Sequence, residues 1–187
     1  RVNFPSGFGS PLARERLVSA LAADPPRLDL AALAIATLAN PDLDAAACLH
    51  TLDALAARVQ LEVERHMEEG PSLARLRALR HVLADIEGFR GNEKDYYSPE
   101  NSFLDHVLAH KVGLPITLSV VYLEVARRAG ISLYGVAFPG HFLVACNAGN
   151  HKLVIDPFHN GDILTEAGCQ ELLKRVREKL VRRHILT

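Results

Sequence analysis

The residues best suited to do chemistry lie in the last third of the chain, where His141 follows a Pro-Gly turn and Asp156 precedes a proline. Each stands at one end of a segment rich in β-branched and aromatic residues, which predicts two neighbouring strands. Neighbouring strands lie about 4.8 Å apart, so the carboxylate can accept a hydrogen bond from the imidazole and orient it. A His-Asp pair of this kind serves as a general base when a nucleophile faces the imidazole.

A helix that opens at Pro115 and ends at Gly130 is the element that would supply this nucleophile. Apolar residues cover every side of it, which predicts a buried, central helix. The positive end of the helix dipole would favour a thiolate at its start. This layout is typical of papain-like and transglutaminase-like enzymes, which use Cys, His and Asp.

Four segments carry a family resemblance: residues 91–104, residues 111–119 (KVGLPITLS), residues 138–144 (FPGHFLV) and residues 155–158 (IDPF). They closely resemble the SirB-type regulator family, a bacterial branch of the transglutaminase-like superfamily whose core also occurs in some eukaryotic F-box proteins. The resemblance covers the chain from about Leu28 onward. It implies a regulatory role, since members are described as transcriptional regulators of invasion genes or are uncharacterised. Many members carry a further helical-repeat tail, and this chain ends near where such a tail would begin.

The position of the nucleophile departs from the enzymes of the superfamily. In those enzymes the catalytic Cys opens the core helix about four turns before its closing Gly, which is about 14 to 15 residues. Counting back from Gly130 gives Pro115 or Ile116, and neither can attack a carbonyl. The SirB-type motif itself carries Pro-Ile there. None of the three cysteines matches the position: Cys48, Cys146 and Cys169.

Two hydroxyls, those of Thr117 and Ser119, follow Ile116 on the same helix. They can point toward His141 or away from it, and a hydroxyl has a far higher pKa than a thiol and needs stronger help from a base. The favoured interpretation is structural, with both side chains bonded to helix carbonyls or packed in the core.

The sequence therefore favours a non-catalytic regulatory or protein-interaction module that keeps the cleft of a cysteine-protease-like ancestor. His141 and Asp156 are either a vestigial site or an active one, or a pair that braces two strands. The expected rim consists of Tyr97, Asn101, Pro115 and Gly140, although Asn101 is favoured as a helix cap. The alternative is a hydrolase or acyltransferase that uses His141 and Asp156 with Thr117 or Ser119 as nucleophile.

No metal site or cofactor is predicted. His106 and His110 have the i, i+4 spacing of two-histidine zinc sites, but the segment lacks the Glu of HExxH and a third ligand. His151 and His159 flank the last strand and could approach His141, which the sequence leaves open.

The composition bounds the class of protein. The chain has 187 residues, 49% of them hydrophobic, and a net charge of −1, which predicts a globular protein without strong attraction to nucleic acid or membranes. Direct DNA binding ranks last, because Arg127-Arg128 and residues 174–183 are the only basic patches. Spaced cysteines without a CxxC pair predict free thiols, and the expected compartment is the cytoplasm. Another protein is the expected partner.

The elements around these residues predict an α+β fold. Helices are expected over residues 12–23, 28–39, 42–67, 71–88, 98–111, 115–130 and 165–180, and strands over residues 133–138, 142–146 and 152–155 as an antiparallel meander. Residues 1–90 form an N-terminal helical layer and residues 91–187 a transglutaminase-like core with a closing helix, together one compact unit. The inward residues expected on the closing helix are Leu172, Leu173, Val176 and Leu180.

Overall fold

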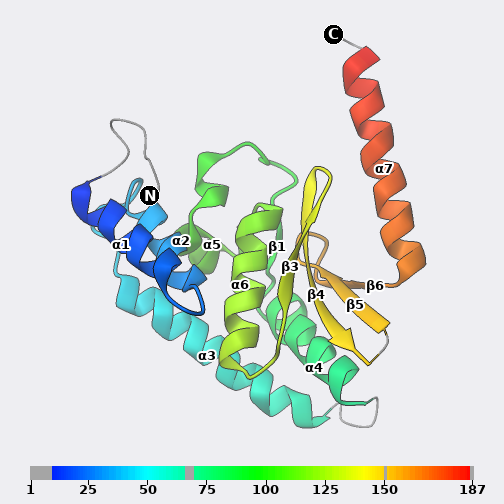
Figure 1. Ribbon diagram of the computed structural model, residues 1–187, viewed down its shortest axis with the longest axis horizontal. Coiled ribbons are helices and arrows are strands. Elements are labelled where there is room, and N and C mark those ends of the chain that lie inside the picture. The colour runs from blue at the N-terminus through cyan, green and yellow to red at the C-terminus, as the bar shows by residue number, and fades with distance from the viewer. Residues whose placement is uncertain (1–9, 66–69, 150, 186–187) are drawn as a thin grey trace.

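A computed structural model describes residues 10–65, 70–149 and 151–185, with side chains described as far as residue 175. The helices are α1 (Pro11–Ala22), α2 (Leu28–Ala36), α3 (Ala45–Val63), α4 (Pro71–Arg80), α5 (Leu104–His110), α6 (Pro115–Arg128) and α7 (Glu166–Ile185). The strands are β1 (Arg90–Gly91), β2 (Val112–Gly113), β3 (Tyr134–Phe138), β4 (His141–Ala148), β5 (His151–Asp156) and β6 (Asp162–Leu164). This arrangement confirms the predicted α+β fold (Figure 1).

The main sheet is an antiparallel meander in the order β3-β4-β5-β6. Its register pairs Val144 with Ile155, and the hairpin that joins β3 to β4 closes on the pair Phe138 and His141. The three longer strands match the predicted ones, whereas β6 was missed. The short parallel pair β1 and β2 was missed as well. Strands of two or three residues are too short to show an alternating pattern in the sequence.

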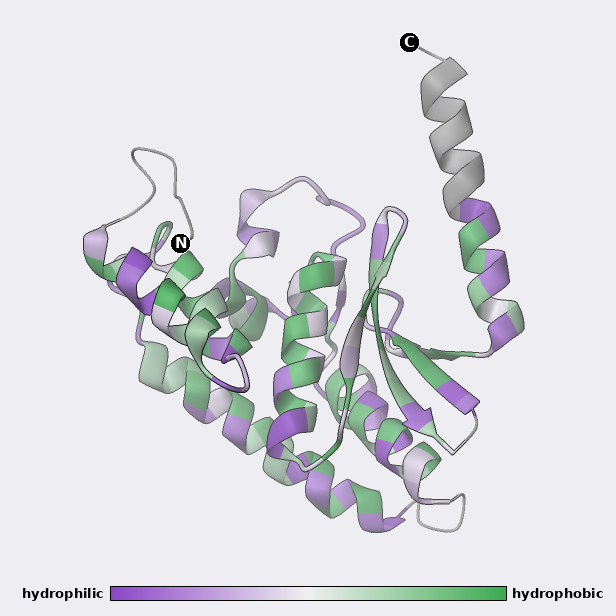
Figure 2. Ribbon diagram, in the orientation of Figure 1, coloured by the Kyte–Doolittle hydropathy of each residue, from purple (hydrophilic) through white to green (hydrophobic). Residues whose placement is uncertain are grey.

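Helix α6 lies between the sheet on one side and the helices α2 and α3 on the other (Figure 1). Its residues Leu118, Val121, Tyr122 and Val125 are fully buried. They join one core that runs from the N-terminal helices through α6 to the inner face of the sheet. A helix that is apolar on most sides packs in this way because layers on both sides are required to bury its apolar surface. Hydrophobic residues recur along α3, α6 and the strands, the elements that enclose this core (Figure 2).

The two faces of the sheet contact different partners. Val144 and Ile155 point toward α6 and join the main core. The alternating residues Leu143, Ala145 and Val154 point the other way, and a separate cluster covers them. That cluster includes residues from β6 and the start of α7: Leu164, Cys169 and Leu172. The sheet therefore has a second, smaller apolar layer outside the main core.

Helix α7 begins as predicted, since the backbone N–H of Gly168 donates to the Thr165 hydroxyl. Leu172 and Leu173 are half-buried. The remaining two predicted inward side chains, Val176 and Leu180, lie outside the described side chains. The far end of the helix extends away from the sheet (Figure 1). Only its first turns therefore act as the closing element that the sequence predicted.

The helix predicted over residues 98–111 is wrong as a single element. A 3-10 turn, η3 (Pro99–Ser102), is followed by an extended residue, Phe103, before α5 begins. The helix predicted over residues 71–88 likewise divides into α4 and a π-helical turn, η2 (His81–Ile86). No helix in the described part of the chain is both long and apolar enough to cross a membrane.

A group of buried charges joins α2 to α6. Asp29 and Glu124 are almost completely buried, and Arg128 contacts both carboxylates. Arg128 also donates from Nε to Asp53 on α3 at 2.7 Å, and Arg127 donates to Glu124 at 2.8 Å. These two arginines are one of the two basic patches that the sequence offered for DNA. Because carboxylates of the same chain neutralise them, that patch is not a free cationic surface.

Candidate functional site

The centre of the site is the carboxylate of Asp156, which stands at the end of β5 and is 2% exposed. Nε2 of His141 lies 2.8 Å from both of its oxygens. Nδ1 of His159 lies 2.7 Å from Oδ2. The backbone N–H groups of Phe158 and His159 donate to Oδ1 at 3.0 and 3.3 Å. A single buried carboxylate thus receives two imidazoles and two backbone amides.

The charge of this carboxylate is set by its hydrogen bonds. Burial raises the pKa of Asp156, but the bonds from His141 and His159 outweigh burial and hold the pKa well below its ordinary value. The hydrogen bond between Asp156 and His159 has the opposite effect on the histidine, because it raises the pKa of His159. Asp156 is therefore ionised at neutral pH, and it favours a protonated His159.

The structure thus brings His141 and Asp156 together, as their predicted strands require. The sequence left the position of His159 open. A signal for it was present: in Asp-Pro-Phe-His the aspartate begins a turn, and its carboxylate accepts from backbone N–H groups two and three residues later. That turn brings the histidine three residues on back to the same carboxylate.

Gly140 positions His141 from the other side. The Pro-Gly loop closes the β3–β4 hairpin, and Gly140 has φ of 66°, a left-handed conformation that favours glycine after proline in a tight turn. The turn starts β4 at His141, whose side chain is 8% exposed. Gly140 therefore acts through the backbone and presents no side chain to a ligand.

The first two residues of α6 are apolar. Pro115 is buried at the first position of the helix, and Ile116 is 47% exposed. Thr117 is 5% exposed and Ser119 is fully buried. The Ser119 hydroxyl donates to the carbonyl of Pro115 at 2.7 Å, which is the structural role that the sequence favoured. Within the described residues, no hydrogen bond joins Thr117 or Ser119 to His141.

Asn101 is neither a helix cap nor an exposed rim residue. It lies inside η3, after Ser98, and is 1% exposed. Its amide donates to the carbonyls of Asp95 and Tyr96 at 2.7 and 3.1 Å, and its oxygen accepts from Asn92 at 2.9 Å. Asn101 therefore holds the preceding loop from below. Sequence reasoning missed this role because the bonded partners are carbonyls of a loop without regular structure.

A row of aromatic rings connects that loop to the His-Asp pair. Tyr97, 79% exposed, contacts the Tyr96 ring edge-on with centroids 5.3 Å apart. Tyr96 contacts Phe158 at 5.9 Å, and Phe158 contacts the His141 ring at 5.9 Å. Gly91 makes this packing possible, because a Cβ there would lie 2.4 Å from the Phe158 ring. Tyr97 is thus linked to the site through two intervening rings.

The comparison with known proteins identifies the superfamily. A profile described as the Transglutaminase-like superfamily matches residues 46–185, which is most of the chain. The chain belongs to the transglutaminase-like superfamily. No solved structure matches it.

Several curated proteins are similar to this transglutaminase-like chain. A UPF0162 protein of Xylella fastidiosa is 41% identical over 153 residues, which is 80% of this chain and 51% of the relative. The UPF0162 protein of Pseudomonas aeruginosa is 32% identical over 88% of this chain and 58% of its own length. F-box only protein 21 of Mus musculus is 38% identical over 52% of this chain and 17% of its own length. The chain thus spans about half the length of the first UPF0162 relatives.

The cysteines of this transglutaminase-like chain are not activated. All three are free thiols. Burial raises the pKa of each, with added repulsion from Asp105 and Asp44 at Cys48 and from Glu166 at Cys169. A catalytic thiol needs the opposite, a lowered pKa next to a cation or a helix start.

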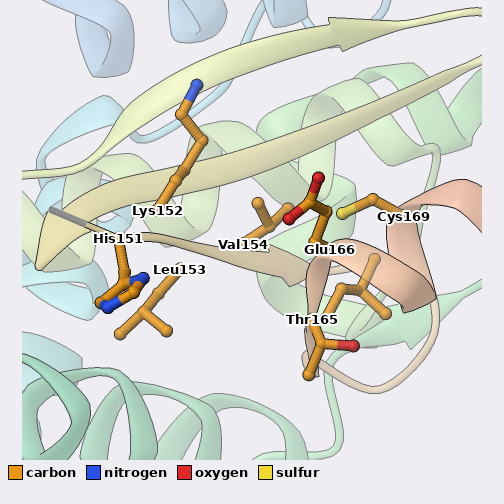
Figure 3. Close-up of a pocket in the computed structure, with 8 residues that line it drawn as sticks. His151, Lys152, Leu153, Val154, Thr165, Glu166 and Cys169 are labelled. Atoms are coloured by element: carbon orange, nitrogen blue, oxygen red, sulfur yellow. The ribbon is translucent and has the colours of Figure 1, made fainter.

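A groove on another part of the transglutaminase-like fold is not lined by the His-Asp pair. It has a volume of about 560 Å³ between β5, β6 and the first turn of α7 (Figure 3). Its lining residues are His151, Lys152, Leu153, Val154, Leu164, Thr165, Glu166 and Cys169. The predicted site residues are absent from this lining.

His106 and His110 stack with ring centroids 4.0 Å apart on α5. Nδ1 of His110 lies 3.1 Å from the carbonyl of His106, and Nε2 of His106 lies 3.7 Å from Glu100. In the described part of the chain, these residues do not converge with a third ligand in the way a metal site requires.

Proposed function

We propose that this chain is a non-catalytic protein-interaction module of regulatory type, related in role to the SirB-type transcriptional regulators. The start of α6 carries the proposal. There the spacing of the superfamily enzymes predicts the catalytic Cys, and this chain has Pro115 and Ile116 at those positions instead. A base without a nucleophile beside it cannot start acyl transfer by the route of the cysteine enzymes.

The hydroxyl groups do not replace the thiol. The Ser119 hydroxyl donates a hydrogen bond to the Pro115 carbonyl and is buried in the core. Thr117 lies one residue beyond Ile116 and is almost completely buried. A hydroxyl nucleophile needs a direct hydrogen bond to its base, and neither residue makes one to His141 in the described structure.

The two tyrosines linked to the pair by ring contacts suit a protein partner. Tyr97 is exposed by 79% and Tyr96 by 37%. Tyrosine is enriched at protein interfaces because its ring buries a large area at little cost in conformational entropy. The ring contacts from Tyr97 to His141 hold these side chains on a supported base.

The experiment that tests the proposal is turnover of acyl and amide probes. The full chain is assayed with a p-nitrophenyl ester and with a fluorescent amine plus a glutamine peptide. His141→Ala is compared with the native chain, and His151→Ala serves as control because His151 lies on β5 outside the His-Asp pair.

The expected result is the same background rate for all three proteins. Turnover that disappears in His141→Ala and survives in His151→Ala would overturn the proposal. If that turnover also disappeared in Thr117→Val, the enzyme alternative with a hydroxyl nucleophile would take its place.

A further inference from the structure

We propose that His141, Asp156 and His159 form a binding site for a divalent transition-metal ion of the Zn²⁺ class. One ligand atom from each residue can be chosen so that all three lie within 4.8 Å of one another. Over residues 10–65, 70–149 and 151–175, this is the one group of at least three His, Cys, Asp or Glu side chains that converges in this way.

The carboxylate is oriented as a metal ligand would be. Its Oδ1 accepts from two backbone N–H groups, those of Phe158 and His159. Its Oδ2 faces Nδ1 of His159 at 2.7 Å, and Nε2 of His141 lies 2.8 Å from Oδ2 and from Oδ1 alike. Hydrogen bonds to one oxygen fix the carboxylate plane and leave the other to bind an ion, as the outer partners of known metal ligands do.

The types of ligand select the class of ion. Two imidazoles and one carboxylate bind Zn²⁺, Co²⁺ or Fe²⁺ and leave at least one coordination position open. Ca²⁺ and Mg²⁺ prefer sites made of oxygen ligands. A buried carboxylate next to two imidazole nitrogens therefore suits a borderline divalent ion.

The site is open to an ion from one side. His159 has 46% of its side chain exposed, whereas His141 and Asp156 have 8% and 2%. An ion that enters past His159 meets two ligands already held by the protein. Its remaining position faces solvent and is filled by water.

Binding of the ion would replace hydrogen bonds that the two imidazoles already make to Asp156. In the structure the same nitrogens that would bind the ion share protons with Asp156. On binding, the proton at each of these nitrogens moves to the other ring nitrogen or leaves to solvent. The ion thus replaces two hydrogen bonds, and the side chains keep their directions.

The test is Co²⁺ and Zn²⁺ binding by the full chain after treatment with a chelator. Visible absorption reports coordinated Co²⁺, and calorimetry gives the stoichiometry and affinity for Zn²⁺. His159→Gln is the informative variant because its side chain is 46% exposed, so we expect its replacement to leave the fold intact. His151→Gln and His106→Gln are matched controls, each an imidazole outside the cluster.

The expected result is one ion bound per chain. The dissociation constant should be at least about tenfold larger in His159→Gln, whereas both control variants should bind with the native affinity. The inference is overturned if the chain binds no Co²⁺ or Zn²⁺ at about 100 μM, a weak affinity for a three-ligand site. It is also overturned if His106→Gln weakens binding and His159→Gln does not. Acyl-probe turnover is read separately, so failure of the proposed function and failure of this inference are distinguishable.

Discussion

Nε2 of His141 lies 2.8 Å from both oxygens of Asp156, so the carboxylate fixes the imidazole ring in one orientation. The second ring nitrogen, Nδ1, is the one left to meet a group on another element. In the site that we propose, that group would come from the start of the central helix, where Pro115 and Ile116 stand. The orienting carboxylate is present, while these first two residues of α6 are apolar.

A thiol placed at the start of α6 should be activated. Ile116→Cys puts a half-exposed thiol at the second position of the helix, where the helix dipole favours a thiolate. In the site that we propose, this thiol would also face the His141 imidazole. We expect iodoacetamide to modify it about five- to tenfold faster at pH 7 than an ordinary surface cysteine. Mass spectrometry of the alkylated peptide measures the rate and separates it from the three native thiols.

Leu61→Cys is the matched control, because Leu61 lies on α3 with 70% exposure and far along its helix. Adding His141→Ala to Ile116→Cys should slow the modification. Equal rates at positions 61 and 116 would show that α6 does not direct its start at the imidazole.

Asn101 should hold the aromatic loop in place. Asn101→Ala leaves the carbonyls of Asp95 and Tyr96 without their amide donor and Asn92 without its acceptor. Because these groups are partly buried, we expect the free energy of unfolding to fall by about 1–3 kcal/mol. Chemical denaturation measures this loss, and hydrogen exchange should show faster opening of residues 92–101.

Asn147→Ala is the control for this loss, since Asn147 is exposed on β4. The one described hydrogen bond of its side chain is with the Tyr134 hydroxyl. Its effect should stay within about 0.5 kcal/mol. An equally small effect of Asn101→Ala would show that the loop is held by its aromatic rings instead.

The sequence was sufficient for the elements that carry a long hydrophobic pattern. The all-round apolar α6 and the three longer strands were predictable because periodicity and turn residues agree there. The break in the helix at Phe103 was not predictable, because the Ser-Pro start and the apolar spacing suit one continuous helix. The hydrogen bonds of Asn101 to the preceding loop accompany this break and have no signal in the sequence. Short β1, β2 and β6 depend on pairing that no local pattern shows.

The site divides in the same way. The meeting of His141 and Asp156 follows from strand order and turn chemistry, both of which are local signals. His159 joins them through a turn, and Phe158 reaches the site because Gly91 lacks a side chain. Such contacts depend on how distant segments approach one another. They became visible only with the fold.

Gly91 should be intolerant of a side chain. In Gly91→Ala the new Cβ would lie 2.4 Å from the ring of Phe158, which must then move away from His141 and Tyr96. We expect the free energy of unfolding to fall by about 1–3 kcal/mol, as for other overpacked positions. Urea denaturation measures the change.

Gly168→Ala provides the opposite case. Its Cβ would meet neighbours at 3.6 Å, an ordinary contact, in the first turn of α7. Alanine favours helix over glycine, so stability should stay the same or rise by up to about 1 kcal/mol. Equal losses for both variants would show that the contact with Phe158 is not the cause.

Asp29 should make the stability of the protein depend on pH in the acid range. Burial raises the pKa of this carboxyl, but hydrogen bonds from Arg27, Arg128 and the backbone of Leu30 lower it to about 2. In the unfolded chain its pKa is about 3.9. The stabilisation is therefore present above about pH 4 and is lost as the pH falls toward 2.

Asp29→Asn isolates this contribution, because a neutral amide resembles the protonated acid at every pH. At pH 7 the free energy of unfolding of the native chain should exceed that of Asp29→Asn by about 2 kcal/mol. This difference should shrink toward zero as the pH falls from about 4 toward 2. Urea denaturation at a series of pH values gives both curves. Asp53→Asn removes an acid that also contacts Arg128 but is 61% exposed, so it should cost little at any pH. A native-minus-Asp29→Asn difference that does not change between pH 7 and the acid limit would show that Asp29 is not held ionised by its arginines.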